Sequence, residues 1–170
     1  MPIQVGKAEI TDHEIFAEMQ YQGAAKSLQE ACFLAAQSLV IRQLLLDAAL
    51  KQQQAADKAK GEKSINPEIE EKLIDNLISK EVHVPKADTA ACKRYYENNK
   101  AKFKDKSTDK ILPFDQVTEH IAEYLGTQSL LRGVSEYIEV LAANTKITGF
   151  DFKDPEKIAV DMKSFTKNAN

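Results

Sequence analysis

Apolar residues recur with the 3.6-residue period of an α-helix over most of the chain. The longest such pattern lies between Ser27 and Gly61, an interval with no proline or glycine before its last residue. Ser27 and Glu30 have the spacing of a capping box, which marks a helix start. From Cys32 to Leu50 the apolar side chains fall on nearly all helical faces. This pattern predicts a long central helix covered by several neighbours.

Four further stretches carry helical stripes with start signals in front of them. They are residues 12–21 after Thr11, 66–80 with Asn66-Pro67, 89–103 after Asp88, and a last long helix from Pro113 to about Asn144. Gly126 and Gly133 lie inside the last stretch, where each costs about 1 kcal/mol relative to alanine. They indicate either a bend in that helix or close packing of another helix against it.

The two ends of the chain have extended character. Residues 3–10 alternate loosely, and residues 146–152 resemble a terminal strand. Because a single strand is not stable alone, we predict that Ile3 or Val5 pairs beside Phe150 or Phe152. The predicted fold class is therefore mostly all-α, a helix bundle with one long central helix and a two-stranded ribbon joining the ends. Residues 153–170 are predicted as a polar tail with a weak helix around 155–165.

Composition narrows the function classes. The 170 residues have ordinary globular composition and a net charge of −3, which disfavours a dedicated nucleic-acid binder. The sequence has no apolar run that approaches the roughly 18 residues needed to span a membrane. It also lacks the basic region followed by an apolar stretch that is typical of a signal peptide. Cys32 and Cys92 are interpreted as two reduced thiols. We therefore expect a cytoplasmic protein.

The sequence contains no pattern that carries catalysis or cofactor binding. His13, His83 and His120 have no second ligand at metal-binding spacing, and no E-x-x-H motif occurs. Nucleophile elbows and glycine-rich nucleotide loops are also missing. Cys32 lies on an apolar helix without a nearby histidine, which favours a small buried side chain over a nucleophile. We expect no enzyme, no cofactor and no metal site.

One stretch has a charge opposite to that of the whole chain. Residues 93–110 hold seven Lys and Arg against three acids, beside three aromatic residues. A solvated, partly flexible linker explains the charges equally well, and the aromatic residues can simply complete the core. The alternative is a surface that binds an acidic partner. The candidate partner-binding residues are Tyr95, Tyr96, Phe103, Lys100, Lys102, Lys104 and Lys106.

Several segments carry a family resemblance. Residues 74–85 read IDNLISKEVHVP, and they are followed by YYENN at 95–99 and by Phe103. Residues 36–49, 111–125, 137–138 and 147–150 add weaker similarity. Together they resemble the helical chaperone domain of parvulin-type prolyl isomerases, the SurA-, PrsA- and NifM-like proteins. The resemblance implies a single helical chaperone domain over residues 1–152.

The chain departs from this family at the catalytic domain. Only residues 104–112 stand between Phe103 and Pro113, where the family carries its parvulin domain. Isomerase activity is therefore not expected for this chain. The resemblance also implies that the surface around Tyr95, which faces the isomerase domain in the family, is uncovered here. It favours a non-catalytic chaperone or assembly factor that binds a protein client. The alternative is a constitutive subunit of a larger complex, and a homodimer stays open.

Overall fold

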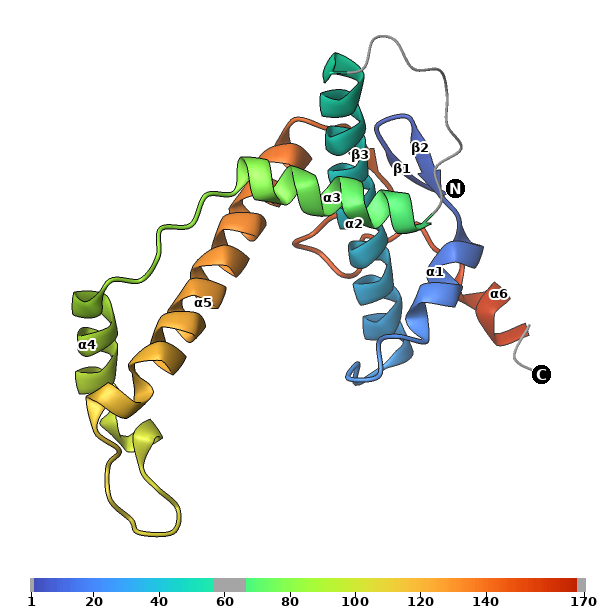
Figure 1. Ribbon diagram of the computed structural model, residues 1–170. Helices are drawn as coiled ribbons and strands as arrows, with labels where there is room; N and C mark the ends of the chain where they lie inside the picture. Colours follow the sequence, from blue (N-terminus) through green and yellow to red (C-terminus); the bar gives the residue numbers. More distant parts are fainter. Residues whose placement is uncertain (1, 57–66, 168–170) are drawn as a thin grey trace. The chain divides into compact units, whose positions relative to one another are not determined.

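The computed structural model describes residues 2–56 and 67–167. In chain order its elements are β1 (Ile3–Val5), β2 (Ala8–Ile10), α1 (Asp12–Met19), α2 (Leu28–Ala56), α3 (Pro67–Glu81), α4 (Thr89–Asn98), the 3₁₀ helix η1 (Lys100–Phe103), α5 (Phe114–Ala143), β3 (Ile147–Thr148) and α6 (Met162–Lys167) (Figure 1). The predicted fold class is confirmed, because the chain is mostly helical with one long central helix and a small sheet. The predicted stop at Gly61 and the cap at Asn66 lie outside the described residues.

The chain divides into two compact units. Unit 1 contains residues 1–77 and 138–170, and unit 2 contains residues 78–137. Two helices, α3 and α5, contribute residues to both units. Each unit has its own cluster of buried apolar side chains.

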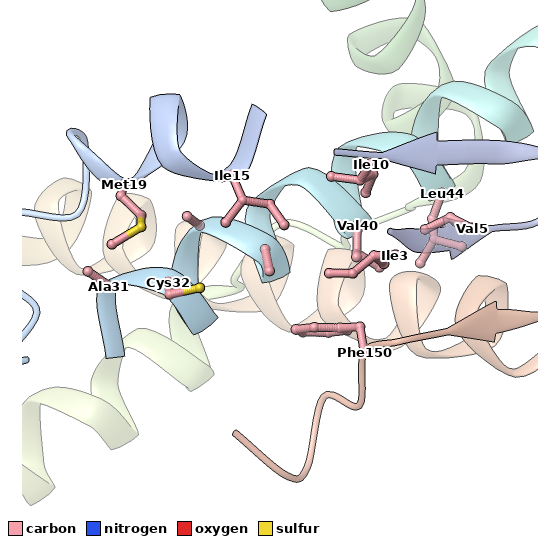
Figure 2. Close-up of a cluster of buried hydrophobic side chains, with 12 residues drawn as sticks. Ile3, Val5, Ile10, Ile15, Met19, Ala31, Cys32, Val40, Leu44 and Phe150 are labelled. Carbon is pink, nitrogen blue, oxygen red and sulfur yellow. The ribbon is translucent and has the colours of Figure 1, made fainter. Parts of the chain in front are cut away.

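The sheet of unit 1 joins the two ends of the chain, as predicted, but with three strands in the order β2-β1-β3. Residues 3–10 form a hairpin instead of one strand, because Gly6 adopts a positive φ of 60° in a two-residue turn. On the other edge of β1, Val5 pairs with Ile147 and Gln4 with Thr148. The expected pairing of β1 with Phe150 or Phe152 is therefore wrong in register. Phe150 instead packs into the core below the sheet (Figure 2).

Among the described residues, the central helix α2 supplies half of the buried side chains in that core, more than any other element. Between Ala31 and Leu50 only Ser38 is exposed, which agrees with the apolar residues on all faces. Figure 2 shows side chains of the hairpin, α1 and α2 that form one buried cluster with Phe150. The Ser27 hydroxyl accepts the amide of Glu30 at 3.1 Å, as predicted. The Glu30 carboxylate, however, accepts the amide of Lys26 at 2.6 Å, so only half of the predicted capping box forms.

The expectation that no segment is long and apolar enough to span a membrane needs a correction. Residues Leu28–Gln53 of α2 are long enough and apolar enough to cross a bilayer, with a mean hydropathy of 1.4. The core helix of a soluble protein passes the same test, and α2 packs against the sheet and α1. Its Arg42 also forms an ion pair with Glu70 of α3 at 2.9 Å. These contacts fit a core helix.

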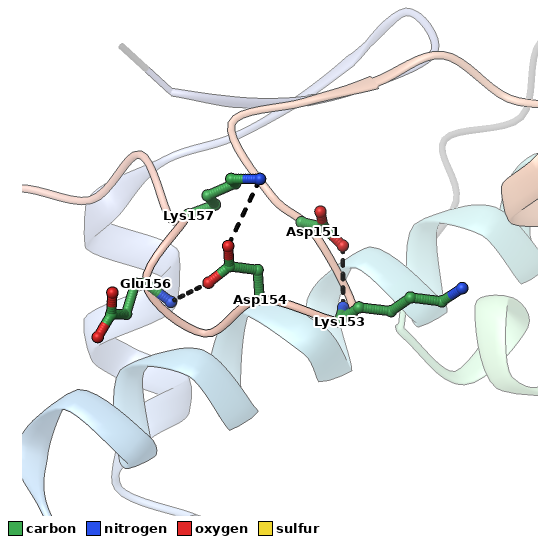
Figure 3. Close-up of polar contacts among 5 residues, drawn as sticks. All are labelled: Asp151, Lys153, Asp154, Glu156 and Lys157. Atoms are coloured by element: carbon green, nitrogen blue, oxygen red, sulfur yellow. Dashed lines mark hydrogen bonds and ion pairs between the residues drawn. The ribbon is translucent and has the colours of Figure 1, made fainter.

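The C-terminal residues differ from the predicted polar tail. Ile158, Val160, Met162 and Phe165 pack against the core of unit 1. The helix predicted around 155–165 begins only at Met162. Before it, the Asp151 and Asp154 carboxylates accept the backbone amides of Lys153 and Glu156 (Figure 3). Such local side-chain bonds stabilise turns in competition with a helix.

Candidate functional site

The candidate residues from the sequence all lie in unit 2, at α4, η1 and the turn that follows. As predicted, the Asp88 side chain caps α4 by accepting the amide of Ala91 at 2.7 Å. The helix ends at Asn98 and not at Phe103 as predicted, and the chain continues as η1. One cause is Asn99, whose side-chain amide donates to the carbonyl of Tyr95 at 2.8 Å. That carbonyl is one of the last in the helix, and side chains commonly bond such groups at a helix end.

Residues 104–112 form a closed turn. Lys104 and Ile111 make an antiparallel bridge, and the amide of Leu112 donates to the carbonyl of Phe103 at 2.8 Å. Inside the turn the Asp105 carboxylate accepts the hydroxyl and the amide of Ser107, and these bonds lower the pKa of Asp105. Most residues of this hydrogen-bonded turn are exposed, which agrees with the interpretation of its charges as solvated. The turn also holds Phe103 against α5.

Tyr96 belongs to the core of unit 2. It is buried with Cys92, Val117 and Ile121, and its hydroxyl donates to the carbonyl of Leu112 at 2.7 Å. Its ring lies 5.5 Å from the rings of both Phe103 and Phe114. For Tyr96 the structure therefore favours the core interpretation over direct contact with a partner.

Tyr95 and Phe103 have a second environment, because they also line a small cavity. We call this cavity the aromatic pocket; its walls are Tyr95, Lys102, Phe103, His120, Ile121 and Tyr124. Its volume is about 270 Å³. The Tyr95 ring lies 6.1 Å from that of Phe103 and 5.4 Å from that of Tyr124, which is 42% exposed. Sequence reasoning missed Tyr124 and His120 because they lie on α5, more than 15 residues away from Tyr95 and Phe103.

The four candidate lysines are not equivalent. Lys100 pairs with Glu97 at 3.0 Å, and Lys104 pairs with Asp109 at 2.9 Å. Lys102 has no carboxylate partner among the described residues, and its ammonium lies 5.8 Å from the centre of the Tyr95 ring. Lys106 is exposed in the turn, also without a carboxylate partner in the part of the chain described. Lys102 is therefore the candidate lysine that combines an unpaired charge with a place in the wall of the pocket.

A larger depression lies further along α5, and sequence reasoning missed it. We call it the α5 groove; it is formed by residues 83–85 and by α5 residues between Leu125 and Glu136, with a volume of about 660 Å³. A side-chain carbon at Gly133 would lie 2.7 Å from Cγ1 of Val82, so the glycine lets the extended segment approach the helix. Close packing at Gly133 was predicted, but the neighbour is the extended residue Val82 and not another helix. Nothing lies within 4 Å of the same position at Gly126.

The aromatic pocket and the α5 groove lie along one side of α5. Ile121 lines the first, and Leu125, Gln128 and Arg132 line the second, at helical spacings of three and four residues. The eleven steps along the helix from Ile121 to Arg132 correspond to about 16 Å. An extended segment of about five residues has the same length.

The described residues contain no group of three or more His, Cys, Asp and Glu that could hold a metal ion. Cys32 and Cys92 are both buried, as expected for Cys32. Burial, with a smaller effect from the negative charge of Asp12, raises the pKa of the Cys32 thiol to about 11. Such a thiol stays protonated at neutral pH, which disfavours nucleophilic chemistry.

Comparisons with protein-family models, with curated proteins and with solved structures give no significant match. The resemblance to the helical domain of parvulin-type chaperones therefore rests on the quoted segments alone.

Proposed function

We propose that this protein is a non-catalytic chaperone or assembly factor that binds a segment of a client protein at unit 2. The observation that carries this proposal is exposed apolar surface beside the α5 groove. Leu131 lines the groove and is 59% exposed, and its neighbour Leu130 is 42% exposed. The wall of the groove also holds six polar or charged residues, so the site combines apolar contacts at Val84, Pro85, Leu125 and Leu131 with groups that can form hydrogen bonds.

The wall of the groove offers a second kind of contact. Residues 82–88 are extended, and the backbone groups of His83 and Val84 have no backbone hydrogen-bond partner among the described residues. An extended segment of a client can pair with such an edge while its side chains enter the groove. Main-chain pairing is independent of sequence, which suits a protein that binds unfolded or immature chains.

The proposed activity does not include isomerisation. The resemblance places the isomerase domain between Phe103 and Pro113, and in this chain the turn there is closed by the Lys104–Ile111 bridge. The proposed work of the protein is therefore capture and release of a client, in the cytoplasm, without covalent chemistry.

The test is suppression of aggregation by the full chain. A denatured model protein is diluted into buffer with and without this protein, and aggregation is followed by light scattering. Leu131→Ser should weaken suppression several-fold. Val140→Ser is the matched control, because Val140 lies on the same helix, is 56% exposed and does not line the groove. Equal suppression by both variants, or no suppression by the wild-type protein, would contradict the proposal.

A constitutive subunit of a larger complex is the second candidate. It is favoured by the exposure of Val140 and Ile111, apolar side chains outside the groove that a permanent partner could cover. Purification from native extract with mass measurement separates the two candidates. A fixed stoichiometry supports the subunit, and substoichiometric clients that are released support the chaperone.

A further inference from the structure

The aromatic pocket has an unpaired cation, Lys102, in its wall. We propose that the pocket takes an aromatic or large aliphatic side chain from a client segment in which the adjacent residue is Asp or Glu, with Lys102 as the pairing cation. This inference rests on the proposed function, because it assumes that unit 2 binds protein segments.

The shape of the pocket suits one large apolar side chain. Three aromatic rings, those of Tyr95, Phe103 and Tyr124, form its walls, and the buried Ile121 contributes an aliphatic surface. Aromatic pairs prefer tilted or edge-to-face packing with ring centres 4.5–7 Å apart. The rings of the pocket already pack in this way around Tyr95, at 5.4 Å and 6.1 Å. A ring from a client can therefore add to an existing aromatic cluster.

Charge complementarity decides the chemistry of the neighbouring residue. Residues 93–110 carry seven basic and three acidic residues in a chain whose net charge is −3. Lys100 and Lys104 are already paired with Glu97 and Asp109. Lys102 is therefore free to pair with a carboxylate that arrives with the client.

The position of Lys102 makes this pairing specific. Its ammonium lies 5.8 Å from the centre of the Tyr95 ring, at the wall of the pocket. Attraction between the ammonium and the ring favours this position. A carboxylate one residue away from the inserted side chain can then accept a charge-assisted hydrogen bond from Lys102. A basic client segment would meet repulsion at the same place.

Defined peptides test this inference on the full chain. Three fluorescein-labelled twelve-residue peptides in a Gly/Ser background carry Asp-Phe-Asp, Asn-Phe-Asn or Asp-Ala-Asp at the centre. Fluorescence anisotropy titrations at low salt should show the first peptide binding at least about tenfold more tightly than the other two. Added salt should reduce this preference, because salt screens exposed charges.

Two lysine variants then show which lysine pairs with the carboxylates of the peptide. Lys102→Gln should remove the preference for Asp-Phe-Asp over Asn-Phe-Asn. Lys104→Gln is the matched control, because it removes a neighbouring lysine that is already paired, and it should keep the preference. Thermal melts of both variants check that unit 2 stays folded. Lys102→Arg retains the positive charge and should therefore retain the preference for Asp-Phe-Asp.

Equal affinity for the Asp and Asn peptides would overturn the inference, as would equal losses in the two lysine variants. Tighter binding of a twelve-nucleotide oligouridine than of the Asp-Phe-Asp peptide would also overturn it, in favour of RNA. If the denatured model protein is still captured in a Leu131-dependent way, these outcomes leave the proposed function standing. If neither the model protein nor any peptide binds, both proposals fail.

Discussion

The two glycines inside α5 provide a sharp test of how the α5 groove is built. Replacing glycine by alanine within a helix stabilises it by about 1 kcal/mol. At Gly126 nothing lies within 4 Å of the new side-chain carbon, so Gly126→Ala should gain this full amount. At Gly133 the new carbon would lie 2.7 Å from Cγ1 of Val82, well inside the roughly 3.5–4.0 Å of a favourable carbon contact.

The Gly133→Ala variant should therefore be less stable than Gly126→Ala. Overpacking of this kind costs about 1–3 kcal/mol, and the valine side chain has little rotamer freedom with which to move away. Subtracting the gain in helix propensity leaves a net change from near zero to about 2 kcal/mol of destabilisation. Urea unfolding followed by circular dichroism measures both variants against the wild-type protein.

A second substitution separates this clash from other causes. Val82→Ala removes Cγ1, so Gly133→Ala should become stabilising in that background, by about 1 kcal/mol. Equal stabilisation by Gly126→Ala and Gly133→Ala in the wild-type background would refute the packing of residues 82–85 against α5. The α5 groove would then lose one of its walls.

Three other predictions follow from the contacts. Phe150 is buried and its ring lies 5.3 Å from that of Phe33, so Phe150→Ala should lower the free energy of unfolding by about 3–5 kcal/mol, measured by urea unfolding. Deletion of residues 147–152 should destabilise unit 1 further. Wild-type stability of either variant would contradict the core described for unit 1. A protease-coupled assay on Xaa-Pro peptides should show only the uncatalysed relaxation over tens to hundreds of seconds, and acceleration at micromolar protein would show that a catalytic site was missed. Burial, with a smaller effect from the negative charge of Asp12, raises the pKa of the Cys32 thiol from 9.0 to about 11. The thiol therefore loses its proton at a lower pH in the unfolded chain than in the folded chain. As a result, the free energy of unfolding should fall by roughly 2–3 kcal/mol as the pH rises from 9 to 11. Cys32→Ala should flatten this part of the pH profile, and an unchanged slope would refute the assignment.

The sequence predicted the helices well because their signals are local. The Thr11 cap, the Asp88 cap and the all-round apolar pattern of α2 each lie within one element, and the structure shows all three. The meeting of the chain ends was also predicted, because an isolated strand needs a partner.

The errors arose where two local preferences compete. Gly6 turned a predicted strand into a hairpin, and Asn99 replaced the last turn of a predicted helix by η1. In the C-terminal region, Asp151 and Asp154 take backbone amides that a helix would use. In each case a short side chain or a glycine offers the backbone an alternative to regular structure.

The candidate site could be predicted only in part. Tyr95, Phe103 and Lys102 are close in sequence, and their cluster of aromatic residues and charge was visible there. Tyr124 and His120 complete the aromatic pocket from α5, and residues 83–85 complete the α5 groove from a different segment. Such partners depend on tertiary packing, and the single hint in the sequence was a glycine inside a helix at Gly133.

Hydrogen–deuterium exchange of the full chain, with and without a reduced and carboxymethylated model protein that stays unfolded, tests the central claim most directly. If unit 2 binds client segments along α5, protection should increase at residues 83–85 and between residues 120 and 136, and exchange in residues 28–50 of α2 should not change. Leu131→Ser should reduce the added protection, and Val140→Ser should not. Protection that appears only in unit 1, or no change in exchange at saturating model protein, would contradict the account.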